Sequence, residues 1–468
     1  MKIIALLLLS SSVLLGLSGS TVWEVRVAGS DTNGGAFVTG ASGTDMSQFN
    51  NANSAGCSSC QSASANISTT DLVTAGTTTI VSATAAFTSA IVGNVVYITG
   101  GTGAVAASWY QVVTYTNATT VVVDRSTGLT AGTGATINIG GALKTYGQLC
   151  GTVNATGGTN GTATAYFLNA GSVFSVTSAS GNVANGTCQI TPQNFVLTEI
   201  GYVSSRTAGN TDTSPTIQAN VTSATMYTTG TNQGITVPLN IAFDGNAQTG
   251  TKFLNLNNFT GWNGRSDTIK NFASASVFTG NNASACLFCT ITGNSVSVLA
   301  GAGMILEYSV IYSNTATAVT STSAQYILTF NNTGGSTDGI VVNGTADHIT
   351  SVGNGRHGIN SGSGTVQNSI LQSNGGYGVN GSALSFTNAC YLNTSGCIQT
   401  GYSSGTITLS GDAFTNTAGN VYSLNNLAGQ GASCRAIALP LAYAATPDFQ
   451  DLGASQHQDP FVIFSRVE

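Results

Sequence analysis

Charged residues are scarce in this sequence. Only 6% of its 468 residues are Asp, Glu, Lys or Arg, whereas ordinary domains have roughly 25%. With 11 basic residues against 17 acidic ones, the chain has too few Lys and Arg to line a groove along nucleic-acid phosphates. We therefore expect no nucleic-acid partner. The 41% of apolar residues argue for a packed core rather than a disordered chain.

Long apolar runs are also rare. The run at the N-terminus, residues 3–17, follows Lys2 and precedes the small residues 18–20. It is shorter than the roughly 20 apolar residues of a membrane-spanning helix, and the pattern is that of a signal peptide. We expect residues 1–20 to be removed, with no membrane span in the remainder. The mature protein would then be secreted or exposed at the cell surface.

Cysteine, by contrast, occurs nine times, and cysteines in an oxidising compartment tend to form disulfides. The spacings suggest three local pairs and one longer loop: Cys57 with Cys60, Cys286 with Cys289, Cys390 with Cys397, and Cys150 with Cys188. This scheme leaves Cys434 unpaired. The two C-x-x-C pairs lie far apart and have no nearby His, so disulfides or buried thiols are favoured and no metal site is expected.

An asparagine recurs at a nearly constant interval through the second half of the chain. The repeated residues are Asn294, Asn314, Asn332, Asn354, Asn374 and Asn393, with spacings of 20, 18, 22, 20 and 19. Each follows a short β-prone run such as CTITGN or SVIYSN, and a period of this size marks a repeat architecture. We predict a solenoid of parallel strands in which the asparagine amides form a ladder from coil to coil.

The repeat occupies only part of the chain. Residues 71–142 contain four β runs separated by turn residues, which is typical of a small antiparallel sheet or barrel inserted near the N-terminus. Residues 21–70 are expected to supply an N-terminal strand and a cap, because the first coil of a solenoid exposes a strand edge. Coils are expected over residues 143–430, and residues 431–468 lose the period and form a C-terminal tail or cap.

Several stretches carry a likeness to known proteins. GSDTNGG and GTDMSQ occur near the start, VVYITGGTG in the insert, IAFDGN in an early coil and DLGASQHQDP in the tail. As a set they resemble the right-handed parallel β-helix, or pectate-lyase-like, repeat proteins of secreted bacterial and bacteriophage origin, a group largely without assigned function. The resemblance covers most of the mature chain. It implies an all-β fold, a right-handed parallel β-helix, but no particular activity.

The densest group of ionisable residues lies in one coil and includes Asp338, Asp347, Arg356 and His357. In the repeat register Asp338 and His357 share a column, so the functional interpretation is an acid/base pair with Arg356 as a cationic substrate anchor. These four residues are the catalytic candidates. The alternative is that they are solvated groups on one coil, since clustered ionisable residues are only a probabilistic signal.

Enzymes of the resembled fold that act on acidic polysaccharides use clustered carboxylates, or calcium with a basic residue. The polygalacturonase branch carries N-T-D, Asp-Asp, G-H-G and R-I-K motifs. This sequence has partial echoes at residues 210–212 and 356–358, and neither an Asp-Asp pair nor R-I-K. Asp244 and Asp267 are candidates for calcium, but two carboxylates make a poor cage. We therefore expect no cofactor.

A second column lies six residues before the repeat asparagines and consists of Phe288, Tyr308, Tyr326 and His348. Rings that point outward would form a strip on which sugar rings can pack, with Tyr308, Tyr326 and His348 as ligand-binding residues. Rings that point inward would fill the core. A one-residue shift of register decides between the two.

These features favour a secreted or surface-exposed β-helix protein with a structural or glycan-binding role, whose partner is a polysaccharide or cell-surface glycan. The scarcity of carboxylates favours this role over a polysaccharide lyase or glycoside hydrolase, which remains one alternative. The signal peptide favours it over the other alternative, a bacteriophage tail fibre or spike component that would form a homotrimer.

Overall fold

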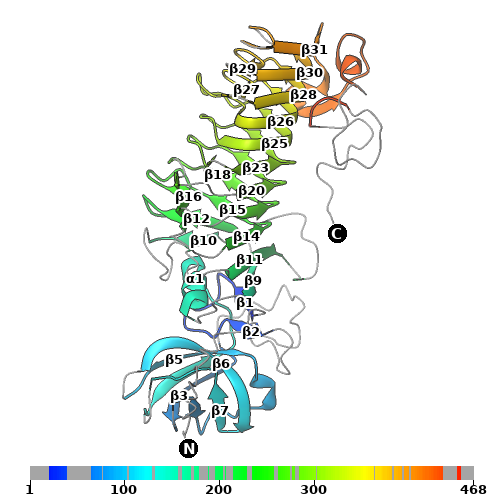
Figure 1. Ribbon diagram of the computed structural model, residues 1–468. Coiled ribbons are helices and arrows are strands. Elements are labelled where there is room, and N and C mark those ends of the chain that lie inside the picture. Colours follow the sequence, from blue (N-terminus) through cyan, green and yellow to red (C-terminus); the bar gives the residue numbers. More distant parts are fainter. Residues whose placement is uncertain are drawn as a thin grey trace, which may run out of the picture.

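The computed structural model describes most of the chain between Thr21 and Ala454. The described residues are 21–38, 65–75, 77–102, 105–128, 132–155, 161–169, 173–178, 188, 195–203, 206, 214–228, 235–257, 262–274, 277–279, 284–301, 303–362, 364–381, 384–392, 395–399, 402–435 and 451–454. Strands dominate them and form a long stack of parallel coils with a small antiparallel barrel at its N-terminal end (Figure 1). Among the described residues, no helix has the length and hydrophobicity that crossing a membrane requires.

The coils form a parallel β-helix, which confirms the expected fold, with about 7 turns over residues 216–392. One long sheet, the first sheet, runs along the whole stack. Its strands in order are β1 (Thr21–Val25), β9 (Gly161–Leu168), β11 (Phe195–Tyr202), β14 (Ile235–Leu239), β17 (Asn263–Arg265), β20 (Ser284–Leu287), β23 (Met304–Glu307), β25 (Val319–Phe330), β26 (Ile340–Val352), β28 (Gly364–Gln372), β30 (Leu384–Leu392) and β31 (Tyr402–Thr408).

Two further sides complete each coil. The second sheet contains β10 (Val173–Val176), β12 (Thr216–Ala219), β15 (Ala242–Asp244), β18 (Thr268–Lys270), β21 (Thr290–Thr292) and β24 (Val310–Tyr312), and continues into the C-terminal parts of β25, β26, β28, β30 and β31. The third side contains β13 (Thr225–Thr228), β16 (Lys252–Asn257) and β19 (Val277–Thr279), and then β22 (Leu299–Ala300), the starts of β25 and β26, β27 (Ile359–Asn360) and β29 (Val379–Asn380).

Equivalent residues of successive coils lie in columns along the axis. On the first sheet, Leu306, Ala324, Ala346, Val366 and Phe386 are paired in register and fully buried. Their neighbours on either side in the chain face outward, because side chains alternate along a strand. The alternation therefore assigns each position to the core or to the outer surface.

The repeat asparagines lie inside the corner that follows the second sheet. Asn294, Asn314, Asn332, Asn354 and Asn374 are at most 2% exposed. Along this series each Nδ2 donates to the Oδ1 of the next asparagine, at 3.0, 2.9, 2.7 and 2.9 Å. A buried amide without partners would cost about 1–3 kcal/mol, so the ladder holds this corner at the same place in every coil. Asn393 lies outside the described residues.

The inserted domain is a closed antiparallel barrel in the order β3-β4-β7-β6-β5-β8. Its strands are β3 (Ile67–Thr74), β4 (Thr79–Val81), β5 (Val95–Gly100), β6 (Val105–Asn117), β7 (Thr120–Val123) and β8 (Ala135–Ile139), with a short 3₁₀ turn at η2 (Ser89–Ile91). The sequence analysis identified four runs. The structure adds β3, which begins before residue 71, and β8, and these two strands pair with each other to close the barrel.

The barrel stands on the N-terminal end of the coils. Strand β1 pairs with β9 as a first rung and with β2 (Ala36–Val38) on its other side. Trp109 of the barrel is buried in the solenoid core and donates its indole N–H to the carbonyl oxygen of Asn33 at 3.0 Å. Helix α1 (Tyr146–Ala155), which the sequence analysis did not foresee, buries Leu149 and Val153 in the same core.

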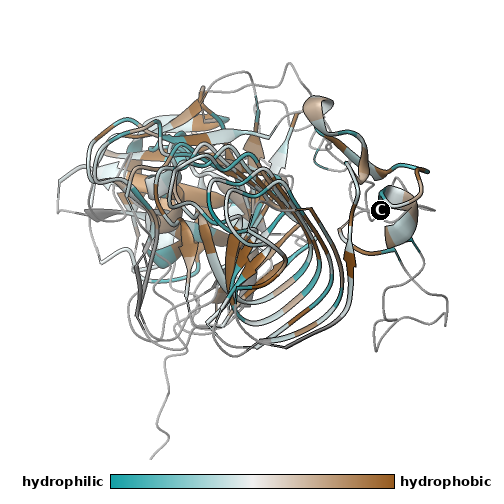
Figure 2. Cartoon of the chain, turned by 90° about the horizontal axis from the view of Figure 1, so that it is seen from above, coloured by the Kyte–Doolittle hydropathy of each residue, from teal (hydrophilic) through white to brown (hydrophobic). Residues whose placement is uncertain are grey.

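The C-terminal segment lies along the side of the coils, which is visible in the view along the axis (Figure 2). It contains the hairpin β32 (Phe414–Asn416) and β33 (Val421–Leu424), with 3₁₀ turns η3 (Thr417–Gly419) and η4 (Gly431–Cys434). Its apolar residues, such as Phe414, Tyr422 and Leu452, cluster with outward residues of the second sheet, such as Phe330 and Ile370. The tail therefore covers a side face of the solenoid.

Three disulfides occur among the described residues: Cys150–Cys188, Cys286–Cys289 and Cys390–Cys434. The first two are the expected pairs. The pairing of Cys390 with Cys397 was wrong, because Cys390 points outward into the cluster under the C-terminal segment while Cys397 is a buried free thiol on the core side. Cys434, expected to be unpaired, is the partner of Cys390. Cys57 and Cys60 lie outside the described residues.

Candidate functional site

The structure separates the four catalytic candidates into two places. Asp338 lies in the turn before the third side and is 1% exposed. Arg356, one coil later, donates from Nε to Asp338 Oδ1 at 2.7 Å and from Nη2 to Oδ2. Asn360 Nδ2 donates to the same Oδ2 at 2.8 Å. This bidentate ion pair joins two coils, and it engages both carboxylate oxygens.

His357 does not form the expected acid/base pair with the Asp338 carboxylate. Its main-chain N–H donates to Asp338 Oδ1 at 3.2 Å, while its ring Nδ1 accepts the main-chain N–H of Tyr377 at 3.0 Å and the two rings stack. Burial and the nearby Arg356 lower the pKa of His357, and Asp338 opposes them only in part. The expected pair assumed an extended strand, in which the His357 side chain would point at the Asp338 carboxylate. Residues 356 and 357 lie instead in a turn, and there the Arg356 side chain binds that carboxylate.

Asp347 lies on the first sheet, next to the aromatic column. It accepts hydrogen bonds from Gln367 Nε2 at 3.0 Å and Asn368 Nδ2 at 2.9 Å, and His348 Nδ1 lies 2.7 Å from its Oδ1. Burial raises the pKa of Asp347, but the His348 contact and the two amide donors outweigh it, so the net shift is downward. Asp347 is therefore an ionised acceptor rather than a proton donor for an acid/base mechanism.

The aromatic column is a continuous stack on the corner between the first and second sheets. Ring centroids of Phe288 and Tyr308 are 5.2 Å apart, those of Tyr308 and Tyr326 are 4.9 Å apart, and those of Tyr326 and His348 are 4.7 Å apart. All four residues have φ between 49° and 58°, a region that bulky residues rarely adopt. The left-handed corner turns their side chains out of the core, which answers the question of register that the sequence left open.

Exposure changes along this column. Phe288 and Tyr308 are half-buried, whereas Tyr326 is 6% exposed and His348 is fully buried. Burial and the adjacent Glu307 carboxylate raise the pKa of Tyr308, so its hydroxyl remains a donor at neutral pH. The accessible part of the column is thus a pair of parallel rings with one phenol group.

Polar columns flank these rings on the first sheet. Residues paired in register immediately before the ring column are Glu307, Gln325, Asp347, Gln367 and Thr387. Two residues earlier, the column contains Ser323, Thr345, Thr365 and Ser385. Except for Asp347, these side chains are half-buried or exposed. The corner and the adjacent face thus combine flat apolar rings with hydroxyl, amide and carboxylate groups.

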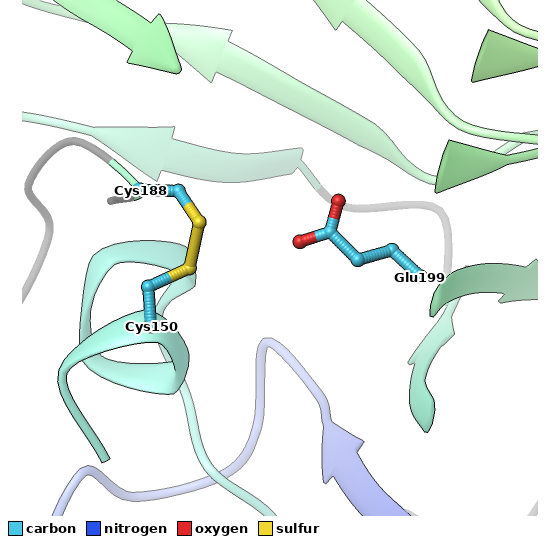
Figure 3. A group of neighbouring side chains, drawn as sticks. All are labelled: Cys150, Cys188 and Glu199. Atoms are coloured by element: carbon cyan, nitrogen blue, oxygen red, sulfur yellow. A yellow bond between two sulfur atoms is a disulfide. The ribbon is translucent and has the colours of Figure 1, made fainter. Parts of the chain in front are cut away.

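A buried carboxyl that the sequence analysis missed lies near the first coil. Glu199 of β11 projects into the core beside the Cys150–Cys188 disulfide (Figure 3). Tyr227 donates its hydroxyl to Glu199 Oε2. Burial raises the pKa of Glu199 to about 8, although Tyr227 and Tyr146 lower it in part. The sulfur and oxygen atoms lie within 4.8 Å of one another, but the disulfide bond occupies both sulfurs.

A second unforeseen group closes the outer face of the first coils. Glu24 accepts hydrogen bonds from Arg26 Nε at 2.7 Å, from Arg206 Nε at 3.0 Å and from the Tyr202 hydroxyl. The guanidinium of Arg206 also lies over the Tyr166 ring. These residues are outside the repeat, so no periodic signal marks them. The network joins β1 to β11 and has the character of a structural link.

The calcium candidates do not form a cage among the described residues. Asp267 is buried and accepts main-chain N–H groups of Ile241 and Arg265, and burial holds its pKa well above the usual range. Asp244 instead accepts Asn271 Nδ2 at 3.0 Å, with Lys270 Nζ at 3.6 Å. The two carboxylates serve separate turns and coil contacts.

Comparison with known proteins gives no family. No family model, no curated protein and no solved structure matches this chain.

Proposed function

We propose that this protein is a secreted or surface-exposed solenoid that binds glycans along the corner formed by Phe288 and Tyr308. The supporting observation is the pair of half-buried, nearly parallel rings, 5.2 Å apart, which continue a longer stack. Because the faces of these rings are turned to their stacking neighbours, the CH groups of a sugar would pack against the outward ring edges and beside the Tyr308 hydroxyl. The ring pair would contact the apolar face of a sugar while the adjacent side chains bind its hydroxyl groups.

The flanking columns support the polar half of this recognition. Gln325 and Gln367 offer amide donors and acceptors, and Ser323 and Thr365 offer hydroxyls, all at the spacing of the coils. An extended polysaccharide lying along the axis would meet the same kinds of group at each coil. The described disulfides support a location in an oxidising compartment.

A polysaccharide-cleaving enzyme is the alternative, and the carboxylates weigh against it. Asp338 is engaged by Arg356 and Asn360, and Asp347 by two amides and His348. Each candidate is therefore an occupied acceptor, whereas a glycosidase needs one carboxyl that donates a proton and a second that acts as base or nucleophile. A bacteriophage fibre role remains the other alternative, and it predicts a trimer in solution.

The test is a glycan-array screen of the mature protein, with reducing-end release measured on every hit. Tyr308→Ala should weaken binding to a hit by about two- to tenfold, since aromatic contacts supply ~0.5–1.5 kcal/mol beyond area burial. Tyr377→Ala is the matched control, because Tyr377 is a half-buried aromatic residue stacked in a different corner. Equal loss in both variants, or no binding at all, would refute the proposal, and product release would favour the enzyme.

A further inference from the structure

Residues 451–454, called the strap below, lie against the coils beside the C-terminal end of the ring column. The main-chain N–H of Gly453 donates to the carbonyl oxygen of Asn368 at 2.8 Å, and that of Ala454 donates to Thr350 Oγ1 at 2.9 Å. Asn368 is the column residue one coil above His348. All four strap residues are buried. The strap therefore contacts the coil that carries His348, at Thr350, and the next coil, at Asn368 and Ile370.

The covered rings belong to the same stack as the accessible ones. Stacking continues without a break from Tyr308 through Tyr326 to His348, yet exposure falls from half-buried to 6% and then to zero. We propose that the strap occupies the upper half of the ligand strip, so that its release lengthens the strip from two rings to four. The identity of the ligand in this inference rests on the proposed glycan binding. The inference that the strap covers the rings does not.

The covered state leaves a polar atom unsatisfied. His348 Nε2 is buried and has no hydrogen-bond partner among the residues that the structure describes. An unpartnered buried polar atom costs about 1–3 kcal/mol. Water or a sugar hydroxyl would bond to this nitrogen once the strap leaves, so opening recovers part of the energy lost in strap contacts.

The strap can separate without loss of the segment that precedes it. The Cys390–Cys434 disulfide fastens that segment to β30. Beyond it, the described main-chain bonds of the strap are those of Gly453 and Ala454 to the coils and of Leu452 N–H to the Cys434 carbonyl oxygen at 2.9 Å. The largest apolar anchor is Leu452, which is fully buried in the cluster on the second sheet. Opening therefore breaks at least these main-chain bonds and the Leu452 contact.

Gly453 gives a specific way to open the strap. Its φ is +85°, and a Cβ at this position would lie 2.5 Å from Thr350 Oγ1 and 2.9 Å from a side-chain carbon of Ile370. Gly453→Val should therefore expel the strap from the coils. Gly396→Val is the matched control, because Gly396 has a φ of +108° but has no atom within 4 Å of its Cβ position. Thr350→Val is a gentler second variant that removes the acceptor for Ala454.

The first measurement is carbethoxylation of His348 by diethyl pyrocarbonate, followed by peptide mass mapping. Modification should be about tenfold faster in Gly453→Val than in the wild type or Gly396→Val, because a local opening equilibrium governs access to a buried group. Thr350→Val should also make the modification of His348 faster, but by a smaller factor. Unchanged His348 reactivity in folded Gly453→Val and Thr350→Val proteins would overturn the assignment of the strap as the cover.

The second measurement is affinity for short and long oligosaccharides of a glycan that the wild type binds. Gly453→Val should bind the longer oligosaccharide about tenfold more tightly, with little change for the shorter one. Exposed His348 with unchanged affinity would overturn the regulatory role while leaving the proposed function intact. If neither the wild type nor Gly453→Val binds a glycan, the proposed function is wrong, and so is the inference that the strap competes with a glycan. The reactivity of His348 still decides whether the strap covers the column.

Discussion

The outward faces of the first and second sheets differ, although from β25 onward the same long strands contribute to both. Along the first sheet, register columns contain Ser323, Thr345 and Thr365, and no described segment of the C-terminal region is hydrogen-bonded to them. Along the second sheet, the equivalent outward column contains Tyr312, Phe330 and Val352. Among the described residues, the first face has no C-terminal segment hydrogen-bonded to these columns, and the second is half of an internal interface.

The second sheet itself changes character along the axis. In its lower coils the column contains Lys270 and Thr292, and it becomes apolar at Tyr312, where the C-terminal cluster begins. In a solenoid coil only the inward side chains form the core. The outward side chains can therefore vary with what packs against them: apolar where another segment covers the sheet, polar where none does. The outward columns of this chain therefore distinguish a covered face from a bare one.

The largest predicted effect tests this difference. Phe330 stacks on Tyr312 at 5.1 Å and contacts Tyr422 of the C-terminal segment at 5.0 Å. Phe330→Ala should lower the free energy of unfolding by about 3 kcal/mol, the usual cost of removing a buried Phe. Gln325→Ala, on the same strand but on the first face, should change it by less than about 0.5 kcal/mol. Chemical denaturation measures both, and equal losses would show that the two faces do not differ in this way.

An interior substitution provides the reference for both faces. Asn332 donates to Asn354 Oδ1 at 2.7 Å and accepts from Asn314 Nδ2 at 2.9 Å. Asn332→Ala should cost about 2 kcal/mol, because it leaves buried partners on two coils unsatisfied. Asn343→Ala is the control, since Asn343 is exposed on β26 and does not adopt the left-handed backbone conformation. Comparable stability of the two variants in denaturant would contradict a structural role for the ladder.

The sequence predicted those parts of the fold that repeat. The asparagine period located the corner and its ladder because the same buried amide is required in every coil. It could not show that Arg356 rather than His357 binds Asp338, since this depends on the path of a turn. It also missed Cys390–Cys434 and Glu199, which bring together residues with no shared period. Contacts that occur once in a solenoid leave no pattern for sequence analysis to detect.

The pH dependence of stability should also differ between the outer surface and the core, and one carboxyl group in each place shows why. Asp347, on the outer face, has a lowered pKa, so its contribution to stability is present above its unfolded pKa and is lost only in acid. Glu199, in the core, has a pKa raised from 4.5 to about 8. Its contribution is complete below the unfolded value and declines as pH rises through about 8, because the ionised form must be buried.

Glu199→Gln tests the contribution of the buried carboxyl group to the pH dependence of stability. The amide keeps the shape of the side chain and cannot ionise, so the variant should lose less stability than the wild type between about pH 5 and 8, the interval between the unfolded and folded pKa of Glu199, when thermal unfolding is followed across that range. Asp347→Asn should leave the pH dependence of stability in this range unchanged and should alter only the loss of stability in acid. If Glu199→Gln and the wild type show parallel profiles over this range, the carboxyl ionises in the folded core without penalty. The difference between core and surface would then not extend to charge.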